Sequence, residues 1–218
     1  AAIGELAARV AHEIRNPVTA ARSLAQLLAR DPTSPHREEH ELILGQLERI
    51  EREVAALLRF ARRDELHRTR VDLADLERAA IGELRAALDD LGIAVDLDLA
   101  DGLVGEVDPE KLRQVVVNLV ENARDALLDV PRERRLEIGL ERRNGDARLV
   151  ISDNGPGFAE DAQARLFEPF FSQKANGTGL GLAIVRRTVE LHGGAISAAR
   201  SASGGAAFTI DLPLRGDA

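Results

Sequence analysis

The spacing of apolar residues in the first sixty or so positions constrains this chain more than any other feature. Apolar or small residues recur at alternating steps of four and three from Ile3 to Leu28, and again from Ile43 to Ala61. This is a heptad seam, the pattern of a helix that packs along its length against another helix. Between the two seams, residues 31–36 (DPTSPH) supply prolines and helix-capping side chains, which end one helix and start the next. The sequence therefore predicts an antiparallel helical hairpin.

A single hairpin would leave much of this apolar surface in water. The seams are widened by four further leucines, at Leu27, Leu42, Leu44 and Leu58. Two hairpins paired as a four-helix bundle would bury that surface, so we expect a homodimer. A monomeric hairpin packed on the rest of the chain is the alternative.

The pattern changes after residue 61. Residues 62–70 (RRDELHRTR) are charged and are expected to form a linker. Beyond them, helical periodicity near 72–91, 108–128 and 179–191 alternates with strand-like stretches at 93–99, 103–107, 135–142, 146–152, 195–200 and 206–212. Asn144-Gly145 predicts a tight hairpin turn, so much of the sheet should be antiparallel. The predicted fold class is α+β, with a helical hairpin over 1–63 and an α/β sandwich over 71–218 that carries its helices on one face.

Charge and composition exclude several kinds of partner. The net charge is −8, so no overall basic field attracts nucleic acid. The six aromatic residues are all Phe, too few for base stacking. No apolar run reaches the length of about 20 residues that spans a membrane. We expect no nucleic acid, no membrane contact by these residues, and a cytoplasmic location that suits a chain without cysteine; whether the whole protein is membrane-anchored stays open.

His12 lies at the heptad position that faces away from the seam, within the segment His12-Glu13-Ile14-Arg15-Asn16-Pro17. A histidine in such a position is usually a surface residue without a role. Here the adjacent Glu13 can take a proton from one ring nitrogen while the other attacks phosphorus. Asn16, one helical turn later, shares the face of His12 and can orient a water.

Polar residues of the second half also allow two interpretations. The chain has no P-loop motif. Asn118 and Asn122 are four residues apart on one helix face, either as plain surface or as oxygen donors to Mg²⁺. Asp153 opens the sequence DNGPG after a strand, either as a turn signal or as a carboxylate that accepts from the adenine amine. Gly155 and Gly157 would let the backbone pack near the base.

Two later segments complete the set. The aromatic cluster at 167–171 (FEPFF) anchors a long loop in the simplest interpretation. The sequence GTGLGL at 177–182 opens a helix, where backbone N–H groups and the positive dipole end favour phosphate. Lys174 lies just before it and adds a cation for a terminal phosphate.

In this order the segments resemble a sensor histidine kinase. HEIRNP resembles the phospho-acceptor box of these kinases, particularly of the nitrogen-regulation type. The four later segments resemble the N box, first glycine box, F box and second glycine box of the Bergerat-type ATP-binding domain shared with gyrase and heat-shock chaperones. The resemblance covers about residues 1–213. It implies a two-component protein-histidine kinase that phosphorylates itself from ATP and passes the phosphoryl group to an aspartate of a response-regulator receiver domain. It also implies a possible phosphatase activity on that regulator.

The resemblance also implies residue roles. It makes His12 the phospho-acceptor, Glu13 its acid–base partner, Asn16 a determinant of phosphatase activity, and Asn122 the Mg²⁺ ligand. The lid over ATP would span roughly 157–178. The residues assigned to ATP are Asn118, Asn122, Asp153, Gly155, Gly157, Phe170, Lys174, Thr178, Gly179, Leu180 and Gly181.

The chain departs from the family pattern in two places. Many relatives carry Lys or Arg three residues after the second Asn, where this chain has Asp125 beside Arg124. The lid is also rather short. A hydrolytic ATPase of the same fold carries Glu four residues before the metal Asn, but this chain has Asn118, which cannot act as a general base. A scaffold without chemistry, and a core in which phosphatase activity dominates, remain alternatives; the stimulus, the cognate regulator and transfer within or across a dimer stay open.

Overall fold

The computed structural model describes residues 65–174 and 179–214 and, among the first 64, residues 14, 18–19, 21–26, 28, 36, 40–48, 50 and 54. The chain divides into two compact units. One consists of Ala1–Glu65 with Phe170–Leu180, the other of Leu66–Pro169 with Gly181–Ala218. The two units are described in turn.

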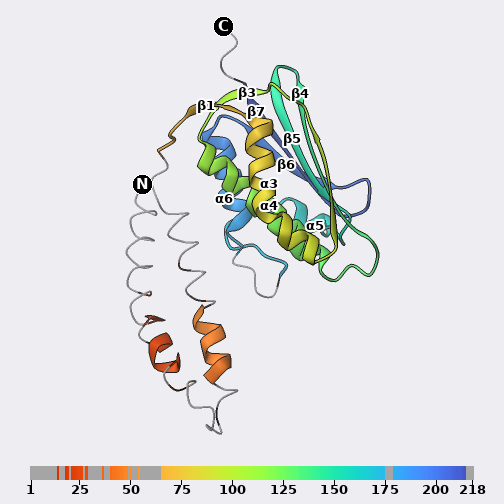
Figure 1. The fold of residues 1–218 in the computed structure, drawn as a ribbon. Coiled ribbons are helices and arrows are strands. Elements are labelled where there is room, and N and C mark those ends of the chain that lie inside the picture. Colours follow the sequence, from red (N-terminus) through yellow and green to blue (C-terminus); the bar gives the residue numbers. More distant parts are fainter. Residues whose placement is uncertain are drawn as a thin grey trace. The chain divides into compact units, whose positions relative to one another are not determined.

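The first unit is helical at every described position among residues 14–28 and 40–54 (Figure 1). Val18, Ala25 and Val54 are buried, whereas other apolar side chains of the same helices face water. Leu24 is exposed, and Leu42 has 68% of its surface exposed. The prediction of helices is confirmed for these residues, and most of the predicted turn at 31–36 lies outside the described part of the chain.

The second unit is built on a five-stranded sheet within residues 65–174 and 179–214. Its strands stand in the order β2 (Ile93–Leu99), β4 (Arg134–Arg143), β5 (Asp146–Asp153), β7 (Ala206–Pro213) and β6 (Ala195–Arg200). β2 pairs parallel with β4, and the remaining pairs in this sheet are antiparallel. β1 (Thr69–Asp72) and β3 (Val104–Val107) form a separate antiparallel pair.

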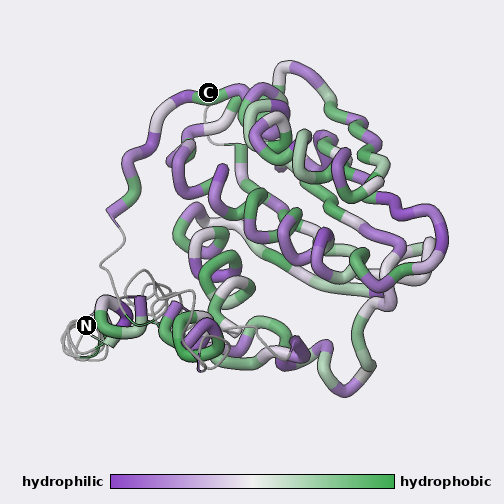
Figure 2. The backbone as a smooth tube through the Cα atoms, turned by 60° about the horizontal axis from the view of Figure 1, so that its bottom comes forward, coloured by the Kyte–Doolittle hydropathy of each residue, from purple (hydrophilic) through white to green (hydrophobic). Residues whose placement is uncertain are grey.

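Helices cover one face of this sheet (Figure 1). They are α3 (Leu73–Asp90), α4 (Pro109–Leu127) and α6 (Gly181–Leu191). The strands β5 and β7 bury alternate residues, as expected for strands whose second face is less covered. Along the helices, apolar positions recur between polar ones (Figure 2), and the apolar stripes meet the sheet in one core. The predicted sandwich with helices on one face is confirmed.

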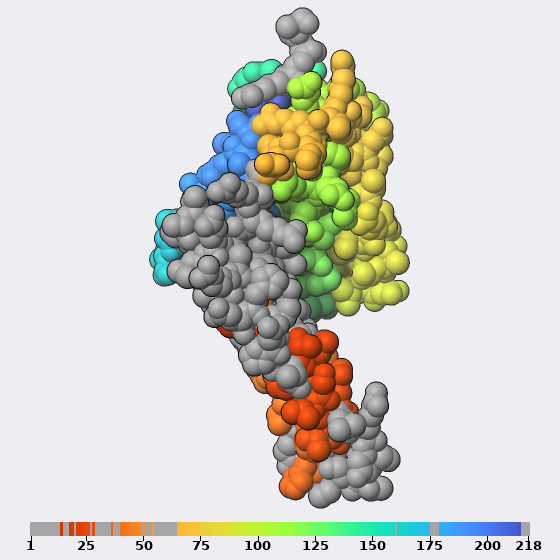
Figure 3. All heavy atoms as spheres, turned by 90° about the vertical axis from the view of Figure 1, so that its left-hand side faces the viewer, coloured from red at the N-terminus to blue at the C-terminus, as the bar shows by residue number. Residues whose placement is uncertain are grey.

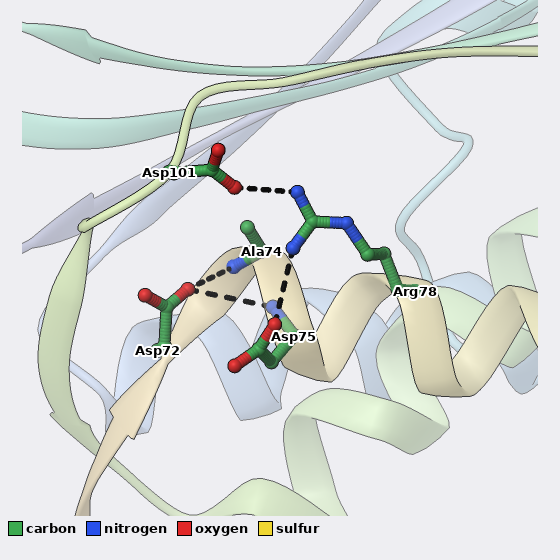
Figure 4. A network of polar contacts seen from close by, with 5 residues as sticks. All are labelled: Asp72, Ala74, Asp75, Arg78 and Asp101. Atoms are coloured by element: carbon green, nitrogen blue, oxygen red, sulfur yellow. Dashed lines mark hydrogen bonds and ion pairs between the residues drawn. The ribbon is translucent and has the colours of Figure 1, made fainter.

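α3 and α4 lie side by side, as the space-filling view shows in yellow and green (Figure 3). Asp72 caps α3 by accepting from the backbone N–H of Ala74 at 2.9 Å, which satisfies a donor that a helix start leaves unpaired. At the same helix end, Arg78 forms ion pairs with Asp75 and Asp101 (Figure 4). Because these ion pairs are exposed to solvent, they contribute little to the free energy of folding. Their effect is to hold the side chains in place at the start of α3.

One arginine joins the opposite ends of the same two helices. The guanidinium of Arg134 donates to Leu91 O just beyond α3 and to Leu128 O just beyond α4, each at 2.7 Å. Carbonyls at helix C-termini lack intrahelical donors, and a cation there is favoured by the helix dipole. A residue at the start of β4 therefore aligns both helices on the sheet.

α3 also buries a carboxyl group. Glu77 is 4% exposed, and its Oε2 has no hydrogen-bond partner. Burial raises the pKa of Glu77 to about 8, because the charged form loses its hydration.

Most predicted elements begin and end within two residues of the observed ones. β2 and β6 match their predicted ranges, and the hairpin at Asn144-Gly145 is present with φ values of 55° and 92°. A short helix, α5 (Glu160–Gln163), lies in the segment expected to be a loop. The last two residues of the charged segment 62–70 belong to β1. No helix in the described part of the chain combines the length and the apolar character needed to cross a membrane.

Candidate functional site

The site is centred on Asp153, the last residue of β5. Its side chain is 3% exposed, and its Oδ1 accepts from the backbone N–H of Gly155 at 2.8 Å and of Ala206 at 3.3 Å. Its main-chain oxygen accepts from the hydroxyl of Ser201 at 2.7 Å. A buried carboxylate held from both ends in this way has a fixed direction, which is what recognition of a single donor on a ligand requires.

Glycines surround Asp153 because there is no space for side chains. A Cβ atom at Gly155 would lie 2.8 Å from Asp153 Oδ1. Gly157 has φ +69°, and its Cβ would lie 2.9 Å from the carbonyl oxygen of Gly205. A Cβ at Gly205 would overlap both the carbonyl and the carboxylate oxygens of Asp153. The predicted glycines are thus required by packing, and Gly205 is a site residue that the sequence analysis missed; its signal was the glycine pair before the last strand.

α4 presents its amide side chains next to this loop. Asn118 and Asn122 are half-buried on α4, and Asn118 Oδ1 accepts from Gln114 Nε2 at 3.0 Å. A Cβ at Gly155 would lie 3.3 Å from the carbonyl oxygen of Ala126, one helical turn beyond Asn122. Because residues four apart share a helix face, Asn122 and the Asp153 loop lie on the same side of α4. Asn122 therefore lies on the face of α4 that the loop after Asp153 approaches, and Asn118 lies one turn before it.

Asp125, which departs from the family pattern, forms an ion pair with its neighbour Arg124. Arg124 NH2 lies 2.9 Å from Asp125 Oδ1, and both side chains are half-exposed. The guanidinium of Arg124 is therefore bound by Asp125, the carboxylate that occupies the position where many relatives carry Lys or Arg.

The start of α6 differs from the glycine turn around Asp153. Gly181 has no positive φ, and a Cβ there would meet no described atom within 4 Å. Neither backbone conformation nor packing requires glycine at this position. Gly181 begins α6, and the N-terminus of a helix, with its backbone N–H groups that lack intrahelical acceptors and its dipole, favours an anion. Leu180, the residue before it, is buried.

The loop assigned to the lid is described over residues 157–174, and its part from Phe170 on belongs to the first unit. Phe170 has φ 68°, is 66% exposed, and donates its N–H to the carbonyl oxygen of Gly179 at 3.0 Å. Gly179 has φ +65°, and a Cβ there would overlap the backbone of Phe170. Lys174 is exposed, and its N–H donates to Ser172 Oγ at 3.1 Å. The hydrogen bond between Phe170 and Gly179 thus joins the two ends of the segment 170–179.

Four predicted site residues lie outside the described residues: His12, Glu13, Asn16 and Thr178. Their roles stay predictions. Among the residues that the structure does describe, no group of three or more His, Asp or Glu side chains gathers to hold a metal ion.

Family comparisons cover both halves of the chain. The family described as "Histidine kinase-, DNA gyrase B-, and HSP90-like ATPase" matches residues 107–216. The "His Kinase A (phospho-acceptor) domain" matches residues 2–66.

Curated relatives are similar over nearly the whole chain. The sensor histidine kinase ZraS of Klebsiella oxytoca is 37% identical over 99% of this chain and 47% of its own length. The signal transduction histidine-protein kinase AtoS of Escherichia coli K12 is 34% identical over 98% of the chain and 35% of its length. Sporulation kinase B of Bacillus subtilis is 33% identical over 97% and 50%. The chain therefore spans half or less of the length of these relatives.

Solved structures extend the similarity to the fold. The full-length ShkA structure in complex with AMPPNP superimposes with a TM-score of 0.77 at 28% identity, over 96% of this chain and 46% of that one. Histidine kinase ThkA in complex with the response regulator protein TrrA superimposes with a TM-score of 0.73 at 28% identity, over 97% and 62%. The chain belongs to the histidine kinase-, gyrase B- and HSP90-like ATPase family and, with its phospho-acceptor domain, is the catalytic core of a sensor histidine kinase.

Proposed function

We propose that this chain is an ATP-dependent protein-histidine kinase that phosphorylates His12 and passes the phosphoryl group to an aspartate of a response-regulator receiver domain. The observation that carries the proposal is the presence, in one chain, of a phospho-acceptor match at residues 2–66 and an ATPase match at 107–216. The buried Asp153 at the centre of the second match supports it. The two halves would work as domains 1–63 and 71–218, joined through residues 62–70.

Asp153 would read the adenine. Its carboxylate is an acceptor without a donor of its own, so it pairs with the exocyclic amine of adenine and rejects a base that presents an oxygen there. Gly155 and Gly157 keep side chains away from the base. The start of α6 at Gly181 would take phosphate, and the resemblance assigns Gly179, Leu180, Thr178 and, as a cation, Lys174 to the same phosphates. Phe170 would line the lid.

Mg²⁺ fits the same side of α4. Asn122 offers an amide oxygen, a ligand type that this hard cation accepts, and Asn118, one turn away, would lie by the phosphates. Because no carboxylate cluster gathers in the described ranges, most remaining ligands would be phosphate oxygens and water. The ion would supply neutralisation of phosphate charge during transfer.

The chemistry at His12 would rest on its neighbours. The free ring nitrogen attacks the γ-phosphorus in line with the leaving oxygen, and Glu13 takes the proton from the other nitrogen as the bond forms. Asn16 would orient a water in the reverse task, removal of phosphate from the regulator. An Asn at position 118 argues against hydrolysis of ATP as the main reaction, since it cannot deprotonate water.

Two kinds of partner follow from the proposal. A second copy of the chain would cover the apolar side chains that the first unit exposes, among them Leu24 and Leu42, and form a four-helix bundle. A receiver domain is the second partner, as in the ThkA structure, which contains the response regulator protein TrrA. A nitrogen-regulation subgroup and a cytoplasmic location stay predictions.

The test is incubation with γ-labelled ATP and Mg²⁺. We expect acid-labile, alkali-stable label on the parent protein and none on His12→Ala or Asn122→Ala. His36→Ala is the matched control, because His36 lies outside the HEIRNP segment, and it should label normally. Label that persists on His12→Ala refutes the assignment of the acceptor. ATP binding without any label on the parent supports a scaffold instead of a kinase.

A further inference from the structure

Asp108 joins the linker to the helix that carries the amide pair. It is buried and is the N-cap of α4, where its Oδ1 accepts from Lys111 N at 3.1 Å. Its second oxygen, Oδ2, accepts from the backbone N–H of His67 at 2.9 Å. Capping α4 needs only the bond to Lys111 N. The bond from the His67 N–H therefore attaches the segment around His67, which leads into the second unit, to the start of α4.

His192 holds the backbone of Asp108 from the other side. The N–H of Asp108 donates to His192 Nε2 at 3.0 Å, so the ring proton resides on Nδ1, which lies 2.8 Å from Thr188 O. Burial lowers the pKa of His192, because the charged ring would lose its hydration. The ring is therefore a neutral acceptor that spans from the end of α6 to the start of α4.

Arg68 provides a second attachment next to the first. Its guanidinium donates to the carbonyl oxygen of Leu191, the last residue of α6, at 2.9 Å. His67 and Arg68 are thus bound to the start of α4 and to the end of α6. These are the two helices that carry Asn122 and Gly181.

We propose that Asp108 and His192 form a clamp that fixes residues 66–68 to the ATP-binding unit, and that His192 thereby acts as a positioning residue for phosphoryl transfer. The inference rests on the proposed function. If the segment is rigid from His67 on, any rotation that brings ATP to His12 takes place N-terminal to His67. In-line transfer tolerates little misplacement, so a released clamp slows transfer while nucleotide binding is retained.

Three substitutions separate the clamp from helix capping. Asp108→Asn keeps an oxygen for Lys111 N, and Asn is a good N-cap, but its NH₂ group cannot accept from His67. His192→Gln places an amide oxygen where Nε2 lies and can still accept from Asp108, whereas His192→Asn is too short. His67→Ala is the matched control, because the His67 side chain is exposed and only its backbone N–H takes part.

The experiment compares three readouts on the full chain: hydrogen exchange at the His67 amide, the Kd for ATP, and the single-turnover rate of autophosphorylation. For Asp108→Asn and His192→Asn we expect exchange to rise about tenfold or more, Kd to stay within about twofold, and the rate to fall about tenfold. His192→Gln and His67→Ala should behave like the parent protein.

Each contrary result has its own meaning. Unchanged exchange at His67 in both Asp108→Asn and His192→Asn overturns the clamp. Raised exchange with an unchanged rate overturns the positioning role, as does a Kd that rises in step with the fall in rate. No label on the parent protein overturns the proposed function and the positioning role with it, whereas hydrogen exchange still tests the clamp.

Discussion

Replacing Glu77 by Gln should remove a pH-dependent loss of stability. Glu77 is buried in α3, and its Oε2 lacks a hydrogen-bond partner. Burial raises its pKa from 4.5 to about 8. The folded protein therefore keeps this carboxyl protonated at pH 7, while the unfolded chain ionises it. Glutamine is neutral at every pH and has nearly the same shape, so it experiences no such difference.

The size of the effect follows from the shift. One pKa unit corresponds to about 1.4 kcal/mol, so the raised pKa of Glu77 amounts to roughly 5 kcal/mol. For a group whose folded pKa is raised, the stability is fully present below pH 4.5 and is lost as pH rises to about 8. Above that value the loss is complete and constant. Relative to the parent, the free energy of unfolding of Glu77→Gln should rise through this window.

Urea unfolding at pH 5, 7 and 9 measures the difference in the free energy of unfolding between the parent and Glu77→Gln. The slope of that free energy against urea concentration checks for two-state behaviour. Glu83→Gln is the matched control, since Glu83 lies on the same helix, is exposed and pairs with Arg113. It should change the free energy by less than about 1 kcal/mol at each pH. Parallel curves for the parent and Glu77→Gln across the whole range would refute the reasoning.

Three further predictions concern the site and the clamp. Gly205→Ala should lower ATP affinity at least about tenfold, because its Cβ overlaps Asp153; Gly139→Ala, whose Cβ has its nearest atom at 3.9 Å, should bind normally in the same titration. Gly181→Ala should keep its Tm yet weaken ATP binding, so an unaltered Kd would contradict a phosphate role. His192 has a lowered pKa, so its stability contribution is present above about pH 6.5 and lost as pH falls; in acid denaturation His192→Gln should lose less stability than the parent below that pH.

Local patterns were enough to predict most elements of the second unit. Period-two burial in β5 and the turn at Asn144-Gly145 depend on neighbouring residues, and both were read directly from the sequence. β1 was not predicted, because it is a four-residue strand within a charged segment. Its stability comes from pairing with β3, a partner that local sequence does not reveal.

The same distinction separates the site residues that were predicted from those that were missed. Asp153 and Asn122 stand in motifs that a reader can recognise along the chain. Asp108 and His192 are 84 residues apart, and their relation is visible only in the folded chain, where the Asp108 N–H donates to His192 Nε2. Gly205 matters because a Cβ atom there would overlap Asp153, and no spacing rule connects those positions. Interactions formed by tertiary packing leave no local trace in the sequence.

The orientation of Asp153 depends on residues that are synthesised much later, Ser201 and Ala206. Ser201 holds its carbonyl oxygen and Ala206 its carboxylate, across 48 and 53 residues. On the ribosome, β5 therefore emerges well before the groups that aim its last residue. A ligand stabilises only the state that binds it, so ATP cannot assist the early stages of folding on the ribosome. The proposed nucleotide site is completed by the hairpin of β6 and β7, so a chain that stalls before β7 lacks it.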